Sequence, residues 1–167
     1  MEDPIKFSKD LIKGRIAETL FEQMLRDAES FTILEFGYEK VLPELAHRLK
    51  DTNEEETMKI IRRAPDFAVI DNVTHEVFLI EVKYRMHPSE ATMLKDAQKV
   101  QEYWKPAYLF VATPFGFYFG KAIDVVNSGG KIMPFSHPRV AVELQDRYKQ
   151  LLNEVIPPTG AADSEEL

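Results

Sequence analysis

The spacing of apolar residues along the chain alternates between helical and strand-like stretches. Over residues 8–28, apolar side chains recur every three or four positions, which predicts an amphipathic helix with Ser8 as its N-cap. The same spacing predicts helices at about 89–104 and 139–153, and a proline opens a shorter helix at 43–49.

Short runs rich in β-branched and aromatic residues predict strands. They lie at residues 31–38, 65–71, 76–83, 107–112, 117–122 and, with a weaker pattern, 131–135. The order helix, strand, strand, strand, helix, strand, with additions after it, is typical of an α/β fold in which a central mixed sheet is flanked by helices. We expect one domain over residues 1–156 and a disordered acidic tail at 157–167.

Length and composition narrow the class of protein. The chain has 167 residues, close to the usual size of one domain, and 44% of them are hydrophobic, which is enough for a core. It has no cysteine, which excludes disulfides, thiolate metal sites and a cysteine nucleophile. It has no apolar start typical of a signal peptide, and no run approaches the roughly 18 apolar residues of a membrane span. We therefore expect a soluble cytoplasmic protein.

The net charge of -7 is unfavourable for a nucleic-acid partner, because phosphate contacts need lysine and arginine. The acidic residues are, however, concentrated at 51–56 and in the tail, and the rest of the chain is neutral. Blocks of like charge repel one another and stay hydrated, so both segments are interpreted as a solvated loop and a solvated tail. The charge therefore does not exclude a nucleic-acid partner.

The strands at 65–71 and 76–83 are close enough in sequence to form a hairpin. A turn centred between residues 73 and 74 places Asp66 opposite Glu81. Like charges in that position destabilise a sheet, so something must offset their repulsion. Lys83 lies on the same face of its strand as Glu81, because side chains alternate between faces. Two carboxylates and an ammonium group are therefore predicted to converge.

Such a cluster suits a divalent cation. Two carboxylate ligands and a backbone carbonyl are the kind of donors that Mg²⁺ takes, with water in its remaining positions. The ion can activate a water molecule and neutralise charge on a phosphate. The alternative is a structural ion network in an unrelated α/β domain.

The first predicted helix carries a third candidate acid. Glu18 lies at the edge of the buried face and leans over Gly14, which has no side chain. That leaves room for a ligand or for water. The alternative is a glutamate at the boundary of the buried face that pairs with Arg15 or Lys13.

These residues resemble the signature of a known family. Gly14-x-x-x-Glu18 on the first helix, Pro65-Asp66, and Glu81-Val82-Lys83 in the second strand of the hairpin resemble the PD-(D/E)XK nuclease superfamily. The glycine and glutamate of the helix are similar to those of Holliday-junction resolvases and related members. The resemblance covers roughly residues 8–122 and implies a restriction-endonuclease-like αβββαβ core.

The resemblance implies Mg²⁺- or Mn²⁺-dependent hydrolysis of DNA, including structured or branched DNA, by a homodimer. Asp66, Glu81 and the carbonyl of Val82 would hold the metal, and Glu18 would assist the metal or its water. Lys83, with a pKa lowered beside the metal, would orient or deprotonate the attacking water and stabilise charge at phosphorus. The alternative is a catalytically inactive nuclease-fold module that binds nucleic acid or assembles a complex.

Basic and amide side chains near the cluster are candidate contacts to nucleic acid. They are Arg62, Arg63, Arg85, Lys95, Gln98 and Lys99. The alternative for all of them is an ordinary solvated surface. The chain also departs from members of the superfamily that carry a glutamine and a tyrosine four residues apart on the helix after the triplet, since Glu102 follows Gln98 at that distance.

Overall fold

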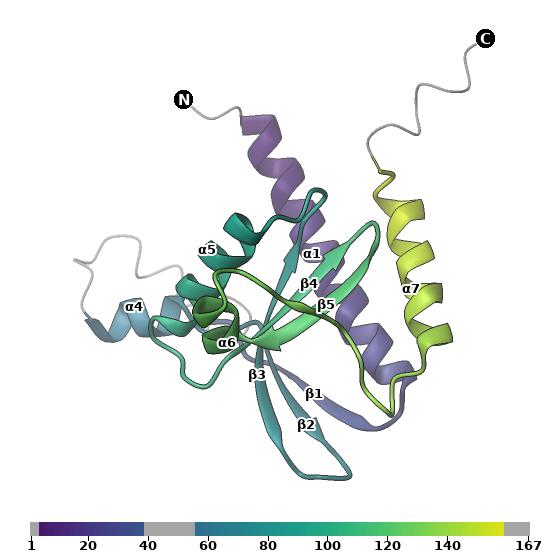
Figure 1. Ribbon diagram of the computed structural model, residues 1–167, viewed down its shortest axis with the longest axis horizontal. Helices are drawn as coiled ribbons and strands as arrows, with labels where there is room; N and C mark the ends of the chain where they lie inside the picture. Colours follow the sequence, from purple (N-terminus) through teal and green to yellow (C-terminus); the bar gives the residue numbers. More distant parts are fainter. Residues whose placement is uncertain (1–3, 39–55, 159–167) are drawn as a thin grey trace.

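A computed structural model describes residues 4–38 and 56–158 of the chain and shows an α/β fold (Figure 1). Its elements are α1 (Pro4–Asp27), β1 (Phe31–Glu35), α4 (Glu56–Arg62), β2 (Phe67–Asp71), β3 (Val77–Tyr84), α5 (Glu90–Gln101), β4 (Tyr108–Thr113), β5 (Gly116–Lys121), α6 (Ala122–Asn127), β6 (Met133–Pro134) and α7 (Val142–Val155). The six strands form one sheet in the order β1-β2-β3-β4-β5-β6. Among the described strands only β3 and β4 pair in parallel, so the predicted mixed sheet is confirmed.

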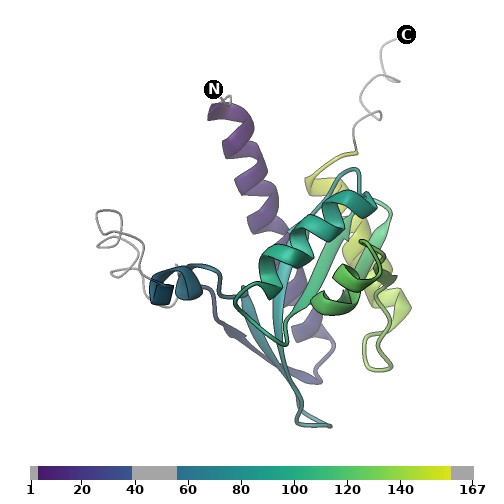
Figure 2. The ribbon, with the colours of Figure 1, turned by 60° about the vertical axis from the view of Figure 1, so that its left-hand side comes forward.

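Helices cover both faces of this sheet, as predicted. Helices α1 and α7 pack together on one face, and α5 and α6 pack together on the other (Figure 2). Parallel neighbours need a long crossover connection, and α5 supplies it between β3 and β4. The end of β3 therefore lies between the two helical layers.

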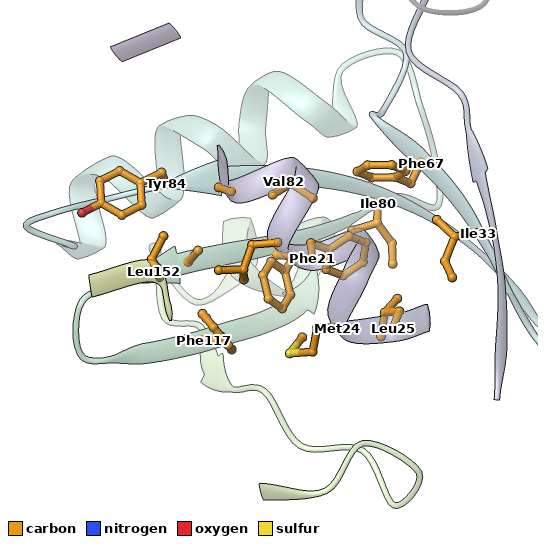
Figure 3. Packing of buried hydrophobic residues seen from close by; sticks show 14 of the residues in the cluster. Phe21, Met24, Leu25, Ile33, Phe67, Ile80, Val82, Tyr84, Phe117 and Leu152 are labelled. Atoms are coloured by element: carbon orange, nitrogen blue, oxygen red, sulfur yellow. The ribbon is translucent and has the colours of Figure 1, made fainter. Parts of the chain in front are cut away.

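The larger part of the hydrophobic core lies between α1, α7 and the sheet. Phe21 of α1 is at its centre, with its ring 5.5 Å from that of Phe67 and 4.7 Å from that of Phe110. Figure 3 shows Met24 and Leu25 of the same helix facing the strands beside it. A smaller cluster on the other face joins α5 and α6 to β4 and β5. The buried stripe of α1 thus fixes this helix across the strands.

Helix α1 begins earlier than predicted. It starts at Pro4, so Ser8 lies inside the helix, where its hydroxyl donates to the carbonyl of Pro4 at 2.9 Å, and the predicted N-cap is wrong. Residues 4–12 are all exposed, and the first turns project beyond the sheet (Figure 1). The choice of Ser8 as N-cap set the predicted start too late, since the helix also includes exposed Ile5 and Phe7.

Other predicted boundaries shift by a few residues. The first strand ends at Glu35, and α5 begins at Glu90 with Ser89 as its N-cap and ends before Trp104. Glu56, expected in an acidic loop, begins α4. The predicted helix at 43–49 and most of the predicted tail lie outside the described residues.

The turn of the β2–β3 hairpin is held by a buried carboxylate. Asp71 accepts hydrogen bonds from the backbone N–H groups of Val73 and Thr74 at 2.8 and 3.0 Å. The guanidinium of Arg139 also binds it, which ties the hairpin to the segment before α7. Asp71 is 2% exposed, so its charge needs these partners.

None of the helices in the described parts of the chain combines the length and the apolar character needed to cross a membrane.

Candidate active site

The predicted register of the hairpin is confirmed. Phe67 pairs with Ile80, and each following residue of β2 pairs with the preceding residue of β3. Continued by one position, this register places Asp66 opposite Glu81. The regular ladder ends at Phe67, so Asp66 lies where the two strands begin to separate.

A proline next to Asp66 explains why the strands separate there. In the same register Pro65 would lie opposite Val82, in a position where two residues normally exchange both backbone hydrogen bonds. Proline has no N–H to donate. The N–H of Val82 is instead bound to Oδ2 of Asp66 at 2.8 Å. The N–H and C=O of one strand residue point the same way. The carbonyl of Val82 therefore also points toward Pro65, which has no N–H to donate to it.

The alternation of β3 places two further candidate side chains on the α5 side of the sheet. Ile80, Val82 and Tyr84 belong to the core under α1. Glu81 and Lys83 point the other way and form an ion pair, with Nζ of Lys83 2.8 Å from Oε1 of Glu81. Their side chains are 16% and 29% exposed, so both are reachable from solvent but largely enclosed.

These groups line one cavity of about 400 Å³ between α1 and the hairpin. Its walls include Asp66, Glu81, Lys83 and, from α1, Gly14 and Glu18. Both interpretations of Glu18 hold in part, because its carboxylate pairs with Arg15 at 3.3 Å and also lines the cavity. The fold thus brings together every residue of the predicted catalytic set.

Close to Asp66, the carboxylates of Glu81 and Glu18 outweigh the ammonium group of Lys83. Burial, followed by the carboxylates of Glu81 and Glu18, raises the pKa of Asp66 to about 8, against the smaller opposite effects of the Val82 N–H and Lys83. Without a cation, Asp66 therefore holds its proton to a higher pH than an ordinary aspartate does. A divalent cation would relieve this excess of negative charge, so the donor set fits Mg²⁺.

Lys83 is an ammonium group in this arrangement. Burial lowers its pKa, but Glu81 first, and then Asp66 and Asp96, outweigh that effect and leave the pKa above its ordinary value. This direction is opposite to that expected beside a metal. It favours a lysine that donates hydrogen bonds and stabilises negative charge over one that removes a proton.

The carboxylates do not form a metal cluster by themselves. Among residues 4–38 and 56–158, no three histidine, aspartate or glutamate side chains are grouped so that they could hold an ion. Asp66 and Glu81 with the Val82 carbonyl form a smaller donor set, and Glu18 approaches from the α1 side of the sheet. A direct metal contact from Glu18 stays a prediction.

The candidate contacts to nucleic acid separate into three groups. Arg62 lines the cavity, and Arg63 and Lys99 line a neighbouring one. Arg85 also lines the cavity, but Asp96 binds its guanidinium through two hydrogen bonds of 2.9 and 2.5 Å. Exposed Lys95 and Gln98 line neither cavity.

Asp96 is a residue near the site that the sequence analysis missed. It is 6% exposed and fixes Arg85 beside Lys83. Its position was a usable signal, because it lies three residues after Met93 and four before Val100 on the buried stripe of α5. An acid on such a stripe needs a cationic partner.

Gly14 is predicted to be replaceable by alanine with a gain in stability. A Cβ at this position would meet nothing within 4 Å, so the folded chain itself gives no steric reason for glycine. Gly14→Ala should raise the free energy of unfolding by about 0.5–1 kcal/mol, because glycine is a poor helix former. Urea denaturation measures this. A larger side chain, as in Gly14→Leu, should instead narrow the cavity. A destabilised alanine variant would show that the space beside Gly14 is not open.

The chain was compared with models of known protein families and with curated proteins, and none of them matches it.

Proposed function

We propose that this protein is a metal-dependent nuclease that hydrolyses phosphodiester bonds of DNA. One observation carries the proposal: Asp66, Glu81, Lys83 and the carbonyl side of Val82 meet where the β2–β3 hairpin opens into a cavity. The order α1, β1, β2, β3, α5, β4 also agrees with the restriction-endonuclease-like core implied by the resemblance, with α4 inserted between β1 and β2.

The residues have separate roles in this proposal. Asp66, Glu81 and the Val82 carbonyl would hold Mg²⁺ or Mn²⁺, and Glu18 would bind water at the same ion. When bound, the ion supplies a Lewis acid that lowers the pKa of a coordinated water and neutralises charge on the phosphate. The hydrogen bond from the N–H of Val82 keeps the Asp66 carboxylate directed into the gap.

Lys83 acts next to this donor set. Its ammonium group donates hydrogen bonds to the attacking water or to a phosphate oxygen, and its charge stabilises the negative charge that develops at phosphorus. The ion pair with Glu81 holds it in place before substrate binds. A homodimer and action on branched DNA follow from the resemblance alone, and a cytoplasmic location follows from the sequence pattern alone, so all three stay predictions.

The test is a cleavage assay of the purified protein on supercoiled, linear, single-stranded and four-way-junction DNA, and on RNA. Cleavage of DNA is expected with Mg²⁺ or Mn²⁺ and is expected to stop with EDTA, because the carboxylates alone cannot activate water. Metal-independent binding of DNA without cleavage of any substrate would instead support the catalytically inactive module.

A further inference from the structure

A second cavity, of about 300 Å³, adjoins the candidate active site. It lies between the end of α4 and the second half of α5. The two cavities share Arg62, Ala64, Glu81 and Lys83 as lining residues. The ion pair between Glu81 and Lys83 therefore lies at the junction of the two cavities. A polymer bound beside Lys83 can extend from one cavity into the other.

The second cavity carries an excess of positive charge. Its charged lining consists of Arg62, Arg63, Lys83, Lys99, Glu81 and Asp96. Both acids are already paired within the fold, Glu81 with Lys83 and Asp96 with Arg85. Within the described ranges, by contrast, the side chains of Arg63 and Lys99 form no ion pair and no hydrogen bond.

Arg63 and Lys99 come from elements that are themselves anchored. The indole N–H of Trp104, just after α5, donates to the carbonyl of Ile60 in α4 at 2.8 Å. The backbone N–H of Arg63 continues the helical bonding to Lys59 at 3.1 Å. The α5 side of the cavity includes buried Val100. Two residues of like charge thus line one cavity from anchored elements, an arrangement that favours an anion between them.

We infer that this cavity, the Arg63–Lys99 subsite, binds a phosphate of the substrate strand that neighbours the phosphate being cleaved. The inference rests on the proposed function, and it defines the substrate as a polynucleotide that spans both cavities. A strand whose scissile phosphate lies beside Lys83 places its next phosphate beyond the Glu81–Lys83 pair, where Arg63 and Lys99 supply the charge it needs. A small phosphodiester with one phosphate uses only the first cavity.

The experiment compares the double variant Arg63→Gln/Lys99→Gln with the control variant Lys59→Gln/Lys131→Gln. The control loses the same charge at two lysines that line neither of the two cavities. Binding of a fluorescein-labelled single-stranded oligonucleotide is measured by anisotropy in EDTA over a series of salt concentrations. Cleavage of the oligonucleotide and of bis(p-nitrophenyl) phosphate, which has a single phosphate, is measured with Mg²⁺. Thermal melting checks that each variant is folded.

We expect the double variant to bind the oligonucleotide about tenfold more weakly than the control, with a salt dependence shallower by roughly 1 to 2 in log–log slope. Its KM for the oligonucleotide should rise while kcat and the rate on the small diester stay at the control values. Equal oligonucleotide binding by the two variants, or an equal loss on the small diester, overturns the subsite.

This experiment distinguishes a failure of the proposed nuclease function from a failure of the Arg63–Lys99 subsite. If the wild type cleaves neither substrate, hydrolysis is wrong, whereas weaker oligonucleotide binding by the double variant still supports the subsite. If the wild type cleaves both substrates and the two variants bind alike, hydrolysis stands and the subsite is wrong.

Discussion

Lys83→Met is expected to lower the rate of DNA cleavage by at least about 100-fold while the protein stays folded. The substitution keeps the aliphatic stem of a half-buried side chain and removes the ammonium group that pairs with Glu81 at 2.8 Å. It removes the cation that lies beside the proposed metal ligand Glu81, where it would stabilise charge at the phosphate. The measurement is a single-turnover cleavage rate at saturating Mg²⁺.

Asp66→Asn should have an effect of similar size for a different reason. The amide oxygen of asparagine can still accept the hydrogen bond from the N–H of Val82, so the hairpin should keep its register. The amide cannot supply the negative charge that a divalent ion requires. Lys131→Gln and Asp124→Asn, two exposed charges that line neither cavity, are the matched controls. Cleavage by either site variant at the control rate would exclude catalysis at this cavity.

The second large effect concerns the pH dependence of stability without metal. The pKa of Asp66 is raised from its ordinary 3.8 to about 8 by burial and by Glu81 and Glu18. Between these values the folded protein holds a proton that the unfolded chain has released, so the free energy of unfolding falls as pH rises from about 4 to 8. One such proton corresponds to a slope on the order of 1 kcal/mol per pH unit. Urea denaturation at a series of pH values without metal measures it.

Two comparisons show whether this pH dependence of stability comes from Asp66. Asp66→Asn should show a flatter profile over the same pH range, because it has no proton to exchange there. Mg²⁺ should stabilise the wild type most near pH 8 and above, where Asp66 is ionised and ready to bind, and least near pH 5. Parallel profiles for wild type and variant would place the titration elsewhere, and equal stabilisation of both by Mg²⁺ would exclude Asp66 as a ligand.

The sequence predicted the part of the fold that depends on local pattern. The buried stripe of α1 and the register of the hairpin are encoded by neighbouring residues, and both are observed. The same register also contained the Pro65–Val82 pairing, which explains why Val82 bonds to a side chain. The side-chain partner of Val82 could have been predicted from the sequence, because proline has no N–H.

The parts that the sequence did not predict depend on contacts between distant residues. Helix α4 is held by Trp104, 44 positions beyond Ile60. The pairing of Arg85 with Asp96 requires that α5 lie beside the end of β3. Six-residue α6 is too short for a periodic signal.

The placement of the candidate catalytic groups has a consequence for how the sequence of such a chain can diverge. Asp66, Glu81 and Lys83 belong to a single hairpin, and its alignment is set by its own turn and by the proline at its open end. Substitutions across the outer helices and connecting segments leave that alignment unchanged as long as the hairpin stays supported. Overall sequence identity can thus decrease while these three side chains keep their positions. Relatives of this chain should therefore be sought by the geometry of its hairpin.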